Sequence, residues 1–259
     1  MNRFLFLILT SIFTLAVNVN VFAADDAQRT VLITGANRGI GYEFVKQYTD
    51  KGYRVIATCR NPAGADDLTA FAAENDNVVI ERLDLVDLPG IDALAAKYAG
   101  QSIDVLINNG ALMRGPDKSQ SFGSMDYDEF DTFFNINVKG PLKVTEAFWP
   151  HVAASDEKMI ASLTTSQGRQ GIPIAGFAYY KSSKAAIDNL YIDIGRKGRK
   201  DGIKVVTLIP GRVATHGEKQ TRGMTPIDTS VAGMIEVMEN HELKQNGKSF
   251  WYTGNESKN

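Results

Sequence analysis

Tyr180 and Lys184 lie four residues apart, and both side chains can take part in proton transfer. Residues with this spacing share one face of an α-helix, so the lysine ammonium would lie within reach of the tyrosine hydroxyl. A tyrosine ordinarily keeps its proton up to a pH of about 10, but a nearby cation in a dry pocket lowers that pKa and allows general acid or base catalysis. The same spacing also occurs on solvated helices where lysine simply extends over a packed tyrosine. The rest of the chain must decide between these two interpretations.

The composition is that of a globular protein long enough for one large α/β domain. The 259 residues are 44% hydrophobic and 22% charged, with a net charge of −2, which gives no electrostatic basis for binding nucleic acid. One basic run, residues 196–200, falls where a helix is expected to end, and cations there stabilise the helix dipole. The single cysteine, Cys59, excludes an intramolecular disulfide and is compatible with either redox compartment.

The first residues predict an export signal. Arg3 precedes an apolar run over residues 4–17, and Val21 and Ala23 supply the small residues of a cleavage site. We therefore expect cleavage after about Ala23, a periplasmic or secreted protein, and one domain over residues 24–259. The alternative is an uncleaved membrane anchor, in which the apolar run extends through Val21.

Short β-branched runs alternate with helix-like stretches along the remaining chain. The expected strands cover residues 31–33, 54–58, 78–83, 103–107, 159–164, 204–209 and 250–252. Continuous apolar strands separated by helices indicate a parallel sheet that is covered on both faces. The predicted fold is therefore α/β, a Rossmann-like doubly wound fold with a seven-stranded parallel sheet, and ligands should bind at the carboxyl ends of the strands.

The turn after the first strand is typical of a dinucleotide site. Glycines 35, 39 and 41 stand between a strand and an amphipathic helix, where they would permit a tight turn, a close approach of pyrophosphate and close helix packing. A merely flexible glycine-rich turn is the alternative, but the strand before and the helix after favour the binding interpretation. The predicted cofactor-binding residues in this turn are Gly35, Asn37, Arg38, Gly39, Ile40 and Gly41.

The end of the second strand favours NADP(H) over NAD(H). An acidic residue there would bind the ribose 2′-hydroxyl of NAD, whereas this chain has Arg60, which with Arg38 offers a cationic clamp for a 2′-phosphate. The alternative is that both arginines are ordinary surface charges.

These motifs together resemble the short-chain dehydrogenase/reductase family over nearly the whole mature chain, and more specifically its C-factor and carbonyl-reductase-like branch. The glycine turn matches TGxxxGxG, and Tyr180 with Lys184 matches YxxxK. Asn137 resembles the catalytic asparagine of the family, which interrupts a helix. Residues 108–111 stand where the family has Asn-Asn-Ala-Gly, with the order of alanine and glycine exchanged. The resemblance adds to the cofactor-binding set Asp84, Leu85, Asn109, Gly110, Tyr180, Lys184, Pro210, Gly211, Val213 and Thr215.

The catalytic hydroxyl is the motif that departs from the family pattern. Where the family usually has Ser-Ser-x-x-Gly, this chain has threonines at 164 and 165 followed by Ser166. Alignment places Thr165 at the reacting position, while the side-chain chemistry favours Ser166. Either hydroxyl can donate a hydrogen bond to a carbonyl oxygen, so both remain candidates.

The resemblance implies a carbonyl–alcohol oxidoreductase in which hydride comes from the cofactor. Tyr180 would protonate the developing alkoxide, Lys184 would lower the pKa of Tyr180 and bind the nicotinamide ribose, and Asn137 would hold a water in the proton path. Small carbonyl or alcohol compounds would be the substrates, and association through the helices carrying Asn137 and Tyr180 would give a homodimer or homotetramer. The alternative function is a non-catalytic NADP(H)-binding sensor or signalling protein on the same fold.

Other side chains complete the predicted site. No metal is required, because His151, His216 and His241 lack the spacing of metal ligands; we interpret them as surface or packing residues, with His216 closest to the expected substrate pocket. One side of that pocket could be lined by large side chains, and core packing is the alternative for each of them. The candidates are Phe177, Tyr179, Met113 and Trp149.

Overall fold

The computed structural model describes residues 28–113, 118–168, 175–215 and 219–257. The predicted export signal, residues 1–23, and His216 lie outside the described residues. Within the described part, no helix combines the length and the apolar character that crossing a membrane requires.

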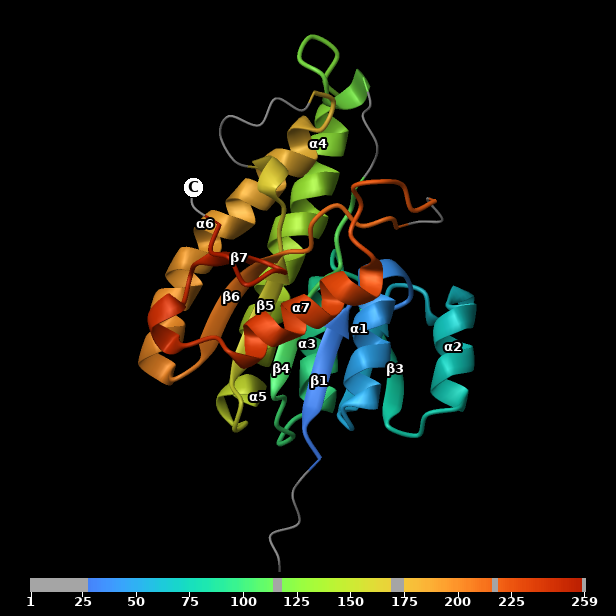
Figure 1. The fold of residues 1–259 in the computed structure, drawn as a ribbon, viewed down its shortest axis with the longest axis vertical. Helices are drawn as coiled ribbons and strands as arrows, with labels where there is room; N and C mark the ends of the chain where they lie inside the picture. Colours follow the sequence, from blue (N-terminus) through green and yellow to red (C-terminus); the bar gives the residue numbers. More distant parts are fainter. Residues whose placement is uncertain (1–27, 114–117, 169–174, 216–218, 258–259) are drawn as a thin grey trace, which may run out of the picture.

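A seven-stranded parallel sheet forms the centre of the molecule, which confirms the predicted fold class (Figure 1). Its strands lie in the order β3-β2-β1-β4-β5-β6-β7, and the reversal of strand order falls between β1 and β4. Most strand residues are buried because helices cover both faces of the sheet, whereas in the edge strand β3 only Val78 is buried. The bounds are β1 (Thr30–Thr34), β2 (Arg54–Cys59), β3 (Val78–Arg82), β4 (Val105–Asn108), β5 (Met159–Leu163), β6 (Lys204–Ile209) and β7 (Ser249–Trp251).

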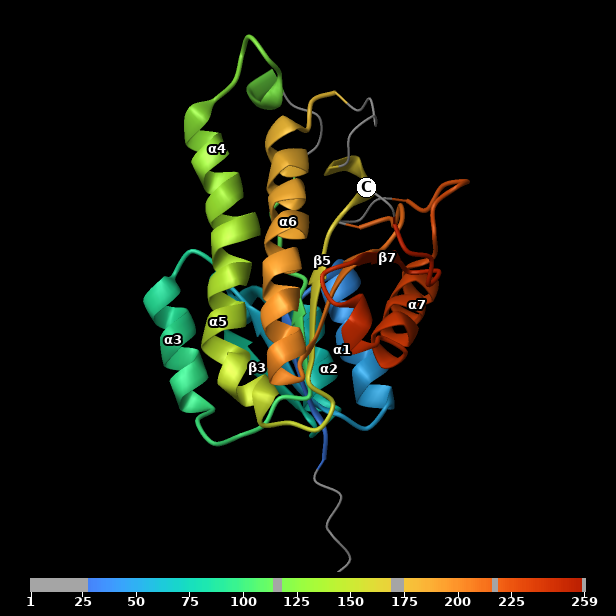
Figure 2. The ribbon, with the colours of Figure 1, turned by 90° about the vertical axis from the view of Figure 1, so that its left-hand side faces the viewer.

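Helices pack on the two faces of the sheet through two separate hydrophobic cores (Figure 2). On one face, α1 (Gly39–Asp50), α2 (Asp66–Ala73) and α7 (Ile227–Glu239) cover one set of alternate strand residues, such as Val31 and Ile33. On the other, α3 (Leu88–Lys97), α5 (Gly140–Ala153) and α6 (Ala178–Asp201) cover the intervening set, such as Leu32 and Leu106. This alternation follows from the period of two along a strand.

One long helical segment runs alongside α6 on one face of the sheet, and its α4 part extends beyond the sheet (Figure 2). It consists of α4 (Tyr127–Phe134), a π-helical turn (Asn135–Lys139) and α5. The basic run 196–200 lies in the last turns of α6, before a left-handed Gly202 with φ of 73° ends the helix, as the sequence predicts.

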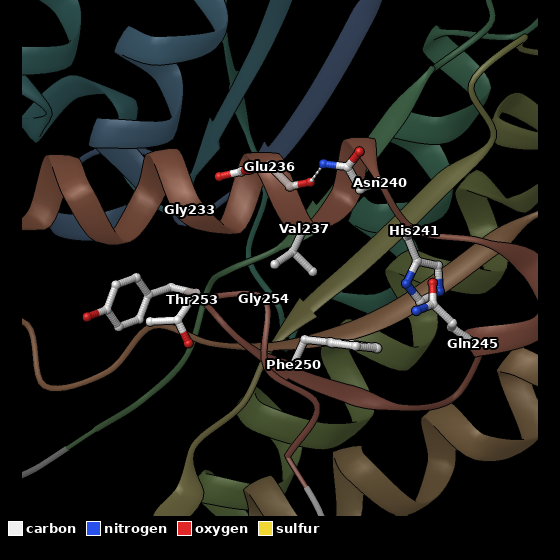
Figure 3. Close-up of a pocket in the computed structure, with 10 residues that line it drawn as sticks. Gly233, Glu236, Val237, Asn240, His241, Gln245, Phe250, Thr253 and Gly254 are labelled. Carbon is white, nitrogen blue, oxygen red and sulfur yellow. Dashed lines mark hydrogen bonds between the residues drawn. The ribbon is translucent and has the colours of Figure 1, made fainter.

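His241 is a packing residue, which confirms the sequence interpretation. It follows α7, is 5% exposed, and lies edge-on to the ring of Phe250 beside a small cavity between α7 and β7 (Figure 3). Its Nε2 lies 3.2 Å from Oδ1 of Asn246, whose amide also accepts from the Val205 N–H and donates to the Ile203 carbonyl oxygen. Burial lowers the pKa of His241 to about 4.

The buried imidazole predicts a loss of stability in mild acid. An unfolded His241 takes up a proton at a pH of about 6.5, whereas the folded one does so only at about 4, so the unfolded state binds more protons between these values. The free energy of unfolding should therefore fall by about 3 kcal/mol as the pH falls from about 6.5 to about 4. Urea unfolding at several pH values measures this slope.

The control is His241→Gln, whose amide can still donate to Asn246 but does not titrate. This variant should lose most of the extra slope between pH 6.5 and 4. An identical slope in both proteins would assign the acid sensitivity to other groups.

Candidate active site

The glycine turn after β1 is held against the end of β4 by a network of backbone contacts. The Asn109 Nδ2 group donates to the carbonyl oxygens of Thr34 and Gly35, at 2.9 and 3.0 Å, and the Thr34 hydroxyl accepts from the N–H groups of Asn109 and Gly110, at 3.1 and 3.0 Å. Gly35 has a φ of +66°, and a Cβ there would lie 2.7 Å from Cα of Gly110. A Cβ at Gly41 would collide with the Gly35 carbonyl oxygen. Backbone atoms, and not side chains, therefore form the surface of this turn, and a phosphate group can approach that surface closely.

A cavity lined by Arg38 and Arg60 opens from this turn toward the ends of β2 and β3. Both arginines are exposed, and within the described ranges neither guanidinium forms an ion pair. Asp84 and Leu85 line the same cavity, at the place the sequence predicts for them. Two unneutralised cations at the mouth of a cavity suit a phosphate-bearing ligand.

A second cavity adjoins the first and contains the proton-transfer pair. The two share five lining residues of the glycine turn and of the segment after β4, so together they form one groove at the carboxyl ends of the strands. Beyond the shared part, the lining of the second cavity includes the predicted residues Gly39, Ile40, Gly41, Asn109, Tyr180, Lys184, Pro210 and Thr215. We call this the cofactor groove. Its glycine floor and its pair of cations fit an extended dinucleotide phosphate.

Gly211 and Val213, also predicted to bind the cofactor, line neither cavity. Gly211 has a φ of +80° and packs beside Tyr252, and Val213 forms a β-bridge with Thr225. In this structure they shape the segment that presents Pro210 and Thr215 to the groove.

Tyr180 and Lys184 both point into the groove from the first turns of α6. Lys184 is 5% exposed, and its Nζ donates to the Leu163 carbonyl oxygen at 2.9 Å. Burial lowers the pKa of Lys184 to about 8, against the opposing effect of Asp188. Burial also raises the pKa of Tyr180 to about 12.

The net shift of the Tyr180 pKa in this structure is upward, and the effect of Lys184 on that pKa stays a prediction. Burial causes this rise, because a phenolate would lose its hydration, and the Lys184 ammonium is engaged by the Leu163 carbonyl oxygen. At neutral pH Tyr180 holds its proton, which is the form that can act as a general acid.

Asn137 occupies the π-helical turn and is completely buried. Its Oδ1 accepts from the Leu112 N–H at 2.6 Å, and its Nδ2 donates to the Leu112 carbonyl oxygen at 2.9 Å and to Ser183 Oγ at 3.0 Å. Ser183 in turn donates to the Tyr180 carbonyl oxygen at 2.8 Å. The side chain thus ties the segment after β4 to the turn of α6 that carries Tyr180, and its role in holding a water stays a prediction.

Comparison with known proteins decides the family. The family model described as short chain dehydrogenase matches residues 29–225. The chain belongs to the short-chain dehydrogenase family.

Relatives of this short-chain dehydrogenase cover nearly its whole length. A 1-hydroxy-2-glutathionyl-2-methyl-3-butene dehydrogenase from Rhodococcus sp. (strain AD45) is 30% identical over 226 residues, covering 85% of this chain and 94% of the relative. The crystal structure of an NADPH-bound carbonyl reductase from chicken fatty liver superimposes with a TM-score of 0.81 at 30% identity, covering 89% and 98% of the two chains. A Burkholderia multivorans structure described as a short-chain dehydrogenase/reductase with bound NADP gives a TM-score of 0.76 at 26% identity, covering 88% and 98%.

The hydroxyl groups after β5 divide between the groove and its margin. Thr165 accepts from the Gln167 N–H at 3.2 Å and Ser166 begins a short 3₁₀-helix, and neither lines the two cavities. Thr164, which the sequence analysis did not select, does line the groove, and its buried hydroxyl has no hydrogen-bond partner in the described part of the chain. The sequence feature that could have pointed to Thr164 is its position at the end of the expected strand, directly before Thr165.

Of the four large side chains that the sequence analysis placed near the pocket, one lines the groove and three do not. Met113 lines the groove. Tyr179 is buried against Phe130 and Phe133, so the packing alternative holds for it. Phe177 precedes α6 outside the cavity linings, and Trp149 is displaced from the pocket, since its Nε1 donates to Asp201 at the far end of α6.

The described histidines have structural contacts. His151 Nε2 lies 3.1 Å from the Ala95 carbonyl oxygen, and its ring packs on Phe148. Over the described ranges, no three His, Cys, Asp or Glu side chains gather in the way a metal ion would require.

Proposed function

We propose that this short-chain dehydrogenase is an NADP(H)-dependent oxidoreductase that interconverts an aldehyde or ketone and the corresponding alcohol. The observation that carries the proposal is the continuous groove, with two guanidinium groups at one end that form no ion pair with any described residue, and Tyr180 with Lys184 at the other end. The likeness to a carbonyl reductase that binds NADPH supports the same assignment.

Each part of the groove suits one part of the cofactor. Arg38 and Arg60 would hold the 2′-phosphate, and the backbone of Gly35 to Gly41 would approach the pyrophosphate. Asp84 and Leu85 would contact the adenine, while Pro210 and Thr215 would face the nicotinamide. NAD(H) is the less favoured cofactor, because it would leave the two arginines without their phosphate.

Tyr180 and the residues around it would deliver one proton to the substrate oxygen during reduction. The bound nicotinamide supplies the hydride. Tyr180, which is protonated at neutral pH, would donate its proton to the developing alkoxide oxygen. Lys184 would bind the nicotinamide ribose, and Asn137 would keep the helical turn that carries Tyr180 in register through Ser183 and Leu112.

The test of this function is NADPH oxidation by the purified protein with a panel of aldehydes and ketones. Turnover of at least one carbonyl compound is the expected result. Tight NADPH binding with no turnover on a broad panel would instead favour a non-catalytic sensor.

Thr165 is the hydroxyl we expect to hold the substrate carbonyl oxygen. Its oxygen accepts from the Gln167 N–H, and a hydroxyl that accepts one hydrogen bond can still donate its own proton. Thr165→Val should lower kcat about 100-fold, the usual effect of removing one such donor. Thr164→Val and Ser166→Ala are the matched variants and should each change kcat less than tenfold. A larger loss in either of them would transfer the role to that residue.

We also propose an exported, periplasmic or secreted enzyme that lacks residues 1–23 and associates as a homodimer or homotetramer. Mass spectrometry of the mature amino terminus tests the first statement, and retention of the full leader would support the membrane anchor instead. Light scattering of the purified enzyme measures the number of subunits.

A further inference from the structure

Gln120 contacts the backbone of Tyr180 through a buried side chain. It ends a short 3₁₀-helix (Lys118–Gln120) in the segment between β4 and α4, and it is 1% exposed. Its Oε1 accepts from the Tyr180 N–H at 3.3 Å. A backbone N–H can only donate, so the side-chain oxygen must face it and the orientation of the amide is fixed. The contact joins the segment before α4 to the first turn of α6.

The first turn of α6 gives this N–H no partner within the helix. Tyr180 is the third residue of α6, and the first N–H groups of an α-helix lack an acceptor one turn earlier. Phe177, which precedes the helix, provides no side-chain cap. Among the described residues, the acceptor for the Tyr180 N–H is therefore the Gln120 oxygen.

The carbonyl group of Tyr180 is held as well. Ser183 donates to it at 2.8 Å and accepts from Nδ2 of Asn137 at 3.0 Å. Asn137 is in turn hydrogen-bonded to both backbone groups of Leu112. Both backbone groups of Tyr180 are thus tied to the chain between β4 and α5, the N–H directly by Gln120 and the carbonyl through Ser183 and Asn137.

The residues around Gln120 anchor it to α4. Ser119 donates to Glu129 of α4 at 2.8 Å, and the Ser119 carbonyl oxygen accepts from the Asp126 N–H at 2.9 Å. The Gln120 side chain therefore starts from a segment that is bound to a neighbouring helix, and it can hold the first turn of α6 in a defined place.

Folding stability alone does not explain a glutamine at this position. The Nε2 group of Gln120 is buried without a hydrogen-bond partner in the described part of the chain. An unpaired buried donor is unfavourable for folding, and an apolar side chain of similar length would avoid it. The amide thus gains the bond to Tyr180 and loses the hydration of its Nε2 group, and these two effects oppose each other. What the glutamine adds is a fixed position for the backbone of Tyr180.

We propose that Gln120 is a positioning residue, whose side-chain oxygen fixes the first turn of α6 so that the Tyr180 hydroxyl meets the substrate oxygen. This inference rests on the proposed carbonyl–alcohol activity. The direction of the Tyr180 side chain in the groove depends on the backbone that Gln120 and Ser183 hold. Proton donation requires the two oxygens to lie within hydrogen-bond distance, so a small shift of this turn slows the reaction without releasing the cofactor.

The experiment measures single-turnover oxidation of NADPH with one aldehyde that the wild type reduces, in the wild type, Gln120→Met and Gln120→Glu. Gln120→Met keeps the length of the side chain and loses the oxygen acceptor, whereas Gln120→Glu retains an acceptor oxygen in either protonation state. The rate should fall about tenfold in Gln120→Met and return to within about threefold of the wild type in Gln120→Glu. The NADPH Kd should stay within about twofold of the wild type in both variants.

The solvent isotope effect separates a misplaced Tyr180 from a partly unfolded protein. If proton donation becomes slower in Gln120→Met, the ratio of its rates in H₂O and D₂O should exceed that of the wild type. A smaller fraction of folded enzyme would lower both rates equally and leave the ratio unchanged.

Gln101 provides the matched control. Its Oε1 accepts from Arg54, the first residue of β2, at 2.7 Å, and it therefore lies at the amino ends of the strands, opposite the groove. Gln101→Met should leave the single-turnover rate within about twofold of the wild type.

Amide hydrogen exchange tests the contact in the wild type without any substitution. The Tyr180 N–H should exchange at least about 100-fold more slowly than an unprotected amide, because Gln120 binds it. An unprotected Tyr180 N–H, a wild-type rate in Gln120→Met, or equal losses in Gln120→Met and Gln120→Glu at an unchanged isotope ratio would overturn the inference alone. Failure of the wild type to reduce any carbonyl compound would overturn the proposed function together with it.

Discussion

Tyr180→Phe should lower kcat for carbonyl reduction at least about 1000-fold while leaving the NADPH Kd within about twofold of the wild type. The substitution removes only the hydroxyl, so the ring still fills its place in the groove. Burial keeps the Tyr180 pKa near 12, and the proton that must reach the alkoxide oxygen is therefore carried by this residue at neutral pH. Steady-state NADPH oxidation and fluorescence titration of NADPH measure the two quantities.

The adjacent tyrosine offers a matched control. Tyr179 is buried against Phe130 and Phe133, and its hydroxyl has no hydrogen-bond partner within the described ranges. Tyr179→Phe removes the same atom one residue away, outside the groove, and should leave kcat within about twofold of the wild type. Comparable activity in Tyr180→Phe and Tyr179→Phe would rule out Tyr180 as the acid.

Arg60→Asp should reverse the cofactor preference. The variant loses a charge-assisted contact with the 2′-phosphate and places a carboxylate where it repels that phosphate and can bind the 2′-hydroxyl of NADH. We expect the ratio of kcat/KM for NADPH to that for NADH to fall at least about 100-fold, through a higher KM for NADPH. Initial rates with both cofactors at one saturating carbonyl concentration give this ratio.

A second charge reversal separates this local effect from a change in net charge. Arg196 lies near the far end of α6, is largely exposed and pairs with Asp193. Arg196→Asp changes the net charge equally but should leave the cofactor ratio within about twofold of the wild type. An unchanged ratio in Arg60→Asp would mean that Arg60 does not meet the 2′-phosphate.

The fold and most of the groove could be predicted from local sequence signals. All seven expected strands are present, with small shifts such as β4, which covers Val105–Asn108 rather than 103–107. Buried parallel strands require continuous apolar runs, so they leave a clear pattern. The glycine turn could also be predicted from the sequence. Gly35 lies so close to Gly110, and Gly41 so close to Gly35, that no side chain fits at either position. In such motifs the residue type itself records the constraint.

The pKa values of buried groups and the contacts between residues far apart in the chain could not be predicted from local sequence. The spacing of Tyr180 and Lys184 gave their shared helix, but burial set the direction of the Tyr180 pKa, and burial depends on every element packed around the residue. The contact between Gln120 and Tyr180 joins residues 60 positions apart. Trp149 likewise lies against the far end of α6 instead of the pocket.

The sequence by itself therefore determined the element order, the glycine floor, the cationic end of the groove and the presence of Tyr180 and Lys184 on one helix. Only the tertiary structure decided that burial raises the pKa of Tyr180, that Asn137 binds Leu112 and Ser183, and that the Gln120 side-chain oxygen accepts from the Tyr180 N–H. The first group depends on periodicity and residue type within short stretches of chain. The second depends on desolvation and on hydrogen bonds between segments that meet only when the whole sheet and its helices are assembled.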